Sequence, residues 1–163
     1  MAMPSDTYRD IMVRTIANYE LVKAYSGQNG GFEVTQLMNS ILAVVGYPQE
    51  RVLKQRLKDL TVADGRKLGL PEIPIIASSP DYIPKNVAEQ AEMIRNAIAQ
   101  GRIGFFSDGH GGDIEFIQLK DQRGRGNNRQ TREVDLPIQL FEAILYGFGN
   151  IAHALFAEAA EAK

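Results

Sequence analysis

The sequence of 163 residues contains no cysteine, no tryptophan and only two histidines. Without cysteine the chain can form no disulfide, no thiolate nucleophile and no cysteine-ligated metal site. Positive charge is also scarce, because 18 Lys and Arg residues stand against 20 Asp and Glu residues and the net charge is −2. The overall charge therefore does not favour nucleic-acid binding, and any basic surface must be local.

Long apolar runs are missing as well. No stretch reaches the length of a membrane span, and no apolar segment of the kind found in signal peptides follows the opening M-A-M-P-S-D. We therefore expect a cytoplasmic protein without membrane contact. The hydrophobic fraction of 44% is sufficient for a buried core. We expect a single domain over residues 1–163, with its core at about 7–157 and short terminal tails.

Apolar residues recur at helical spacing in several segments. A first helix is expected from Ser5 or Asp6 to about Tyr25. A second carries the apolar stripe Val34, Leu37, Met38, Ile41, Leu42 and Val45. A third segment has Leu53, Leu57 and Leu60 in register, and a fourth helix is expected from about Pro84 to Gly101.

The remaining segments predict strands, connections and one last helix. Two short strands are expected at Ile103–Phe106 and Ile114–Leu119. The loop S-D-G-H-G-G-D joins them as a hairpin. Gly65–Pro84 carries four prolines and predicts an irregular connection, whereas Asp121–Arg132 predicts an exposed loop. Asp135 is expected to cap the last helix, with Pro137 in its first turn.

This last helix repeats apolar residues by three and four at Ile138, Phe141, Leu145, Phe148, Ala152 and Leu155, a seam typical of bundle packing or of a helix–helix interface. Together these elements predict a mostly α fold, a helical bundle of four to five helices with a small β-hairpin.

Polar residues cluster near the end of the fourth helix, in R-N-A-I-A-Q-G, residues 95–101. Asn96 and Gln100 lie one turn apart on one face, and the long side chain of Arg95 can reach round to it. A guanidinium in this place could hold a phosphate. Alternatively, Arg95 pairs with Glu92 or a neighbouring helix, and Gln100 only caps the helix end.

Two segments resemble the HEPN superfamily of small helical proteins. R-N-A-I-A-Q-G-R-I stands where that family has Arg, four to six residues and then His, often with Asn directly after the Arg. The second segment, residues 33–50, resembles a helix of a plasmid-borne HEPN branch; its sequence is E-V-T-Q-L-M-N-S-I-L-A-V-V-G-Y-P-Q-E. The order of elements also agrees, and the resemblance spans about residues 7–157.

The resemblance implies an endoribonuclease fold that needs no metal or cofactor. In active HEPN enzymes two protomers bring their motifs together, the His assists attack of the RNA 2′-OH, and the Arg steadies the phosphate. On this chain Arg95 and Asn96 match the motif, but the His position is Gln100. A glutamine amide does not titrate near neutral pH, so it cannot readily take and return a proton. We therefore expect a homodimer with impaired catalysis in a toxin–antitoxin or defence context, with RNA, an antitoxin or a nucleotidyltransferase as partner.

The predicted loop carries four arginines, which form the best local basic patch for RNA phosphates: Arg123, Arg125, Arg129 and Arg132. Arg102, beside the motif, is a fifth candidate for RNA binding. The two histidines are weaker candidates. His110 is expected at an exposed hairpin turn, and His153 is expected to be partly buried at the edge of the last helix's seam. Neither has a metal-ligand partner at a useful spacing.

Three hypotheses stay open at this point. The first is an impaired HEPN homodimer that binds RNA or a protein. The second is an active metal-independent ribonuclease that uses Arg95 and Asn96, with His110 or a water as proton carrier. The third is a helical interaction module in which Arg95 is purely structural.

Overall fold

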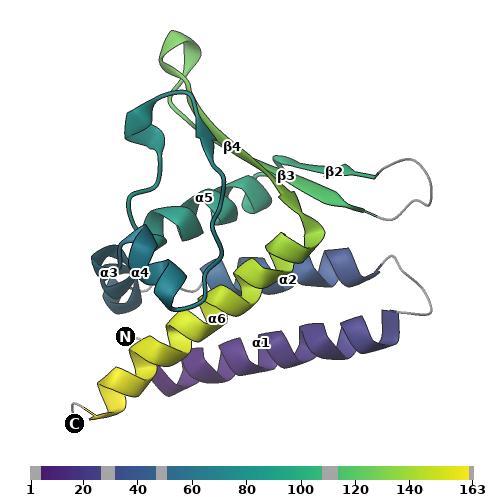
Figure 1. Ribbon diagram of the computed structural model, residues 1–163, viewed down its shortest axis with the longest axis vertical. Coiled ribbons are helices and arrows are strands. Elements are labelled where there is room, and N and C mark those ends of the chain that lie inside the picture. The colour runs from purple at the N-terminus through teal and green to yellow at the C-terminus, as the bar shows by residue number, and fades with distance from the viewer. Residues whose placement is uncertain (1–4, 27–31, 47–50, 108–113, 162–163) are drawn as a thin grey trace.

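A computed structural model describes residues 5–26, 32–46, 51–107 and 114–161 of the chain (Figure 1). Within these ranges the protein is mostly helical, as predicted. Its α-helices are α1 (Ser5–Ser26), α2 (Phe32–Gly46), α3 (Arg51–Asp59), α4 (Val62–Lys67), α5 (Val87–Ala99) and α6 (Ile138–Glu161). Its strands are β1 (Ile76–Ala77), β2 (Ile103–Phe106), β3 (Phe116–Arg123) and β4 (Gln130–Pro137), and short 3-10 turns lie at η2 (Pro80–Tyr82) and η3 (Gly126–Asn128).

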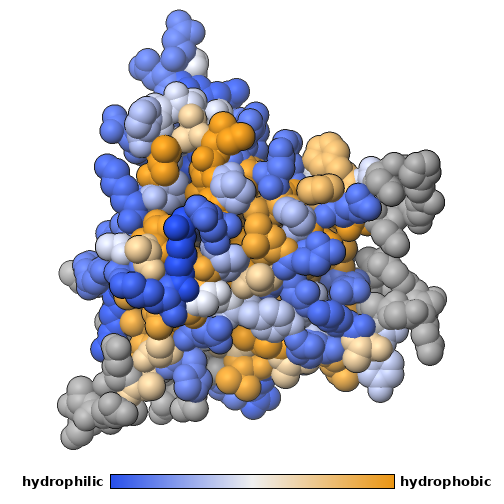
Figure 2. Space-filling model, in the orientation of Figure 1, coloured by the Kyte–Doolittle hydropathy of each residue, from blue (hydrophilic) through white to orange (hydrophobic). Residues whose placement is uncertain are grey.

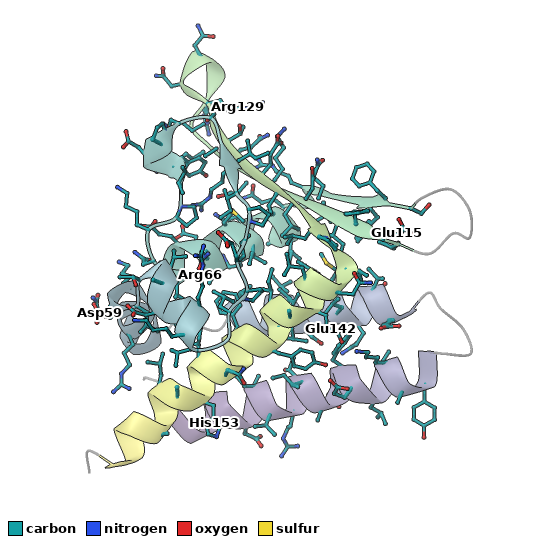
Figure 3. All side chains as sticks on the ribbon, in the orientation of Figure 1. Asp59, Arg66, Glu115, Arg129, Glu142 and His153 are labelled. Atoms are coloured by element: carbon teal, nitrogen blue, oxygen red, sulfur yellow. The ribbon has the colours of Figure 1, made fainter. Side chains whose placement is uncertain are left out.

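The helices α1, α2 and α6 pack together, and α5 lies between α2 and the sheet. The apolar stripes predicted for α2 and α6 form the centre of the core, where Ile41, Val45, Phe141 and Leu145 are fully buried. Most residues of these stripes therefore serve packing within the chain. A polar contact also joins α1 to α6, since the Tyr19 hydroxyl donates to Glu142 over 3.1 Å (Figure 3).

The sheet is antiparallel, with the strand order β1-β4-β3-β2. β3 and β4 form a long two-stranded arm that rises above α6, and Figure 2 shows mainly hydrophilic side chains at its tip. One face of β3 is buried and packs toward α5, because Ile117 and Leu119 are almost completely enclosed. The sheet thus positions the arm directly beside the helix that carries the Arg95–Gln100 segment.

Two predictions about this region are wrong. Asp121–Arg132 is not an exposed loop, because the paired strands extend to Arg123 and start again at Gln130, leaving only 124–129 for the turn. Asp135 does not cap α6. It lies inside β4 opposite Gln118, whose side-chain amide donates to the Asp135 carboxylate over 2.9 Å. The helix begins only at Ile138, directly after Pro137.

The connection before α5 is more ordered than predicted. Thr61 caps the short helix α4 through a capping box, in which its hydroxyl accepts from the Asp64 amide and the Asp64 carboxylate accepts from the Thr61 amide. The pattern T-V-A-D at 61–64 is the signal for this helix. Residues 68–75 are irregular, as predicted, and they lead to the edge strand β1.

Candidate functional site

The helix α5 has well-defined ends. Asn86 caps its start, where its side chain accepts a hydrogen bond from the Glu89 amide over 2.9 Å. At the other end Gly101 adopts φ 64°, so that Gly101 and Arg102 donate their amides to the carbonyls of Ile98 and Ala97. This is a Schellman motif, and it places Gln100 at the C-cap. The predicted stop at Gly101 is found, whereas the helix starts at Val87 instead of Pro84.

Arg95 and Asn96 are held together on α5. The Arg95 guanidinium donates to the Asn96 side-chain oxygen, from Nη2 over 2.7 Å and from Nε over 3.2 Å. Both side chains are half-buried. Gln100 is exposed, and its side chain makes no hydrogen bond with a described residue. Arg95 therefore pairs with its neighbour and not with Glu92, and the polar group at position 100 stays open to solvent.

A polar cleft of about 280 Å³ lies between α5 and the β3–β4 arm. Helix α5 contributes Glu89, Glu92 and Asn96 to it, and the opposite wall is formed by Tyr82 and by side chains of the arm. The arm residues in the cleft include Asp121, Arg123 and Arg132. Asn96 is thus shared between the Arg95 contact and this cleft, whereas Gln100 lies outside it.

A buried polar cluster builds the arm side of the cleft. Asp121 is 1% exposed and accepts from the Tyr82 hydroxyl over 2.9 Å and from Arg132 over 2.9 and 3.0 Å. Two guanidinium groups lie over the Tyr82 ring, with Arg123 at 4.3 Å and Arg132 at 4.5 Å from its centroid. Burial and the hydrogen bond to Asp121 raise the pKa of the Tyr82 hydroxyl to about 12.

The five predicted basic residues fall into three groups. Arg125 and Arg129 lie exposed at the two ends of η3, at the tip of the arm, where Figure 3 labels Arg129. Neither side chain is paired within the described chain. Arg123 stacks on Tyr82 and remains exposed, whereas Arg132 is buried against Asp121. Arg102 is half-buried, and its enclosed Nη1 has no hydrogen-bond partner in the described residues.

The histidines do not complete this site in the described structure. His153 is exposed on α6 (Figure 3). It lines a groove with Met12, Ile16 and Asn150, to which no residue of α5 contributes. The expectation that His153 is partly buried is therefore wrong. His110 lies outside the described residues. No group of three potential metal ligands occurs among the residues that the structure describes.

Comparison with protein families adds the finding that decides the family. The family model described as HEPN pEK499 p136 matches residues 1–157. The chain belongs to this HEPN family. No curated protein and no solved structure gives a significant match.

Family membership agrees with the mostly α fold of this HEPN protein and with the strands that follow α5. The matched range includes residues 33–50 and 95–103, the two segments that carry the resemblance. A search of the described helices finds none long and apolar enough to cross a bilayer.

Proposed function

We propose that this HEPN protein is a homodimer that binds single-stranded RNA and cleaves it poorly or not at all. One observation carries the proposal. Helix α5 keeps Arg95 and Asn96 joined at the edge of a polar cleft, while an exposed glutamine stands where the family's histidine is expected. The protein would act in the cytoplasm, in a toxin–antitoxin or defence setting.

The chemistry of these side chains supports binding without turnover. The guanidinium of Arg95 carries a fixed charge and retains donors beyond those given to Asn96, so it can hold a phosphate oxygen. Gln100 can donate to or accept from RNA, but it cannot exchange a proton during the reaction. The exposed Arg125 and Arg129 on the arm supply further phosphate contacts. Arg132 is left out of the proposed contacts, because its charge is already committed to Asp121.

RNA affinity should fall about tenfold in Arg95→Ala, since a charge-assisted hydrogen bond to phosphate is lost. The slope of log affinity against log salt should also decrease by about one contact. Fluorescence anisotropy with a labelled single-stranded RNA at several salt concentrations measures both quantities. Arg14→Ala is the matched control, because Arg14 is exposed on α1 in an ion pair with Asp10. Equal affinities for native protein and Arg95→Ala would remove Arg95 from the RNA site.

The homodimer part of the proposal needs an apolar surface outside the core. Phe106 and Phe116 are register partners on β2 and β3, and they are 51% and 45% exposed. Phe106 lies shortly after Gln100 in the chain, and Phe116 is its neighbour on β3; both lie on the side of the sheet opposite the buried Ile117. Adjacent exposed aromatic side chains of this kind are typical of protein–protein contact surfaces.

Light scattering after size exclusion should give twice the mass of one chain for native protein and the mass of one chain for Phe106→Asp. The charge introduced into an apolar interface would be desolvated without a partner, which opposes association. Val13→Asp, a change at another exposed apolar residue, should leave the dimer intact. A native protein that is monomeric at micromolar concentration contradicts the dimer, and a dimeric Phe106→Asp moves the interface elsewhere.

A further inference from the structure

We infer that the cleft beside α5 binds one unpaired guanine base, which Glu92 and Asn96 recognise through its Watson–Crick edge. The inference rests on the proposed RNA-binding function and adds which part of the RNA enters the cleft. It is drawn from the donors and acceptors that the two walls of the cleft present.

The contact with Arg95 fixes the orientation of the Asn96 amide. A guanidinium has donors only, so the Asn96 atom that faces it must be the carbonyl oxygen. The amide nitrogen of Asn96 therefore points away from Arg95, and its two hydrogens have no hydrogen-bond partner in the described chain. Because Asn96 lines the cleft, this nitrogen is available to donate to a ligand there.

Glu92 supplies an acceptor beside that donor. It lies four residues before Asn96, so the two Cβ atoms are about 5–6 Å apart on one helix face. Glu92 is half-buried, lines the cleft and makes no hydrogen bond or ion pair with any described residue. The neighbouring Glu89 is already engaged, since its carboxylate accepts from the Lys85 amide over 2.8 Å. The helix wall thus presents one free carboxylate next to one free amide donor.

The opposite wall presents a flat cationic surface. The guanidinium of Arg123 lies over the Tyr82 ring, and the Tyr82 hydroxyl is fixed by its hydrogen bond to the buried Asp121. Arg123 is exposed, which leaves its outer face open to the cleft. A planar base stacks well on a guanidinium. The wall therefore suits a nucleobase.

Guanine matches the helix wall better than the other bases. Its Watson–Crick edge places two adjacent donors, N1–H and N2–H, beside the O6 acceptor. The donors fit both oxygens of Glu92, and O6 fits the Asn96 amide. Adenine, cytosine and uracil each offer only one donor group beside an acceptor, so each loses one charge-assisted hydrogen bond.

The charge and the size of the cleft agree with a bound RNA whose base enters the cleft while its phosphates stay outside. Four carboxylates and three cationic side chains line the cleft, so its interior does not attract an anion. Its volume of about 280 Å³ lies near the lower end of small-molecule sites, which run from about 300 Å³ upward, and suits a group the size of one base.

Base preference tests the inference directly. Labelled oligouridylate RNAs carrying a single central guanine, adenine or cytosine would be titrated against native protein, Glu92→Gln and Glu115→Gln. The guanine RNA should bind native protein about tenfold more tightly than the others. Glu92→Gln should remove this preference. Glu115→Gln, which removes the same charge from an exposed residue away from the cleft, should retain it. Equal affinity for all RNAs, or a preference that survives Glu92→Gln, overturns the inference while the proposed RNA binding stands.

A second measurement separates the two proposals if no RNA binds. Guanosine, adenosine and cytidine 5′-monophosphates carry the same phosphate, and NMR can follow the side-chain amide of Asn96 during their titration. A shift with the guanosine nucleotide alone supports the cleft assignment even if the RNA-binding function fails. No selective shift, or a shift caused only by a tetralysine peptide, overturns it.

Discussion

Replacing Asp121 by alanine is expected to lower the free energy of unfolding by about 3–5 kcal/mol. The substitution leaves the guanidinium of Arg132, which is 6% exposed, without its counter-charge. It also removes the acceptor of the Tyr82 hydroxyl. An uncompensated buried charge accounts for most of the expected loss, because desolvation of Arg132 is no longer offset by its ion pair.

Chemical denaturation of the native protein and of Asp121→Ala measures this loss. Glu133→Ala is the matched control, because Glu133 pairs with Lys120 on the same two strands over 3.0 Å while both side chains are about 40% exposed. An exposed pair contributes about 0–1 kcal/mol, so this control should change stability little. A double variant, Asp121→Leu with Arg132→Met, should be more stable than Asp121→Ala, since neither charge remains buried. Equal stabilities of Asp121→Ala and Glu133→Ala would show that the pair does not anchor the arm.

Gln100→His is expected to raise the rate of RNA cleavage by about 10²- to 10⁴-fold over the native protein. Histidine titrates near neutral pH and can take and return a proton, which glutamine cannot. The position is exposed at the C-cap of α5, so the ring has room to reach bound RNA.

A cleavage assay on purified variants tests this expectation. Gln100→Ala is the matched control for a change at the same position, and it should stay as inactive as the native protein. The combined variant Arg95→Ala with Gln100→His should lose the gained activity, which separates site-specific cleavage from a contaminating nuclease. If Gln100→His cuts RNA no faster than Gln100→Ala, α5 does not hold a HEPN active site that lacks only its proton carrier.

Helical periodicity was sufficient to predict most of the scaffold. The stripes of α2 and α6 are buried as their spacing indicated, because positions three and four apart share a helix face. Gly101 ends α5 because its backbone adopts φ 64°, a conformation that other residues avoid. The strand β2 occupies the predicted residues, where an apolar run follows a glycine stop.

The extent of the β3–β4 arm was not predictable from local patterns. Charged residues usually indicate exposure, yet Asp121 and Arg132 are buried because each neutralises the other across the register of the two strands. Their partner Tyr82 comes from a proline-rich connection and meets them only in the folded chain. The same limit applies to the cleft. Arg95 and Asn96 are neighbours in sequence, but nothing local indicates that Arg123 lies on the opposite wall.

We propose above that this HEPN protein holds RNA and cleaves it poorly or not at all. The most direct measurement incubates the native protein with an end-labelled single-stranded RNA and divides each sample between a native and a denaturing gel. We expect RNA that is shifted on the native gel and mostly full-length on the denaturing gel, with the shift reduced in Arg95→Ala. Full-length RNA without any shift, or RNA cut completely by the native protein but not by Arg95→Ala, would contradict the proposed function.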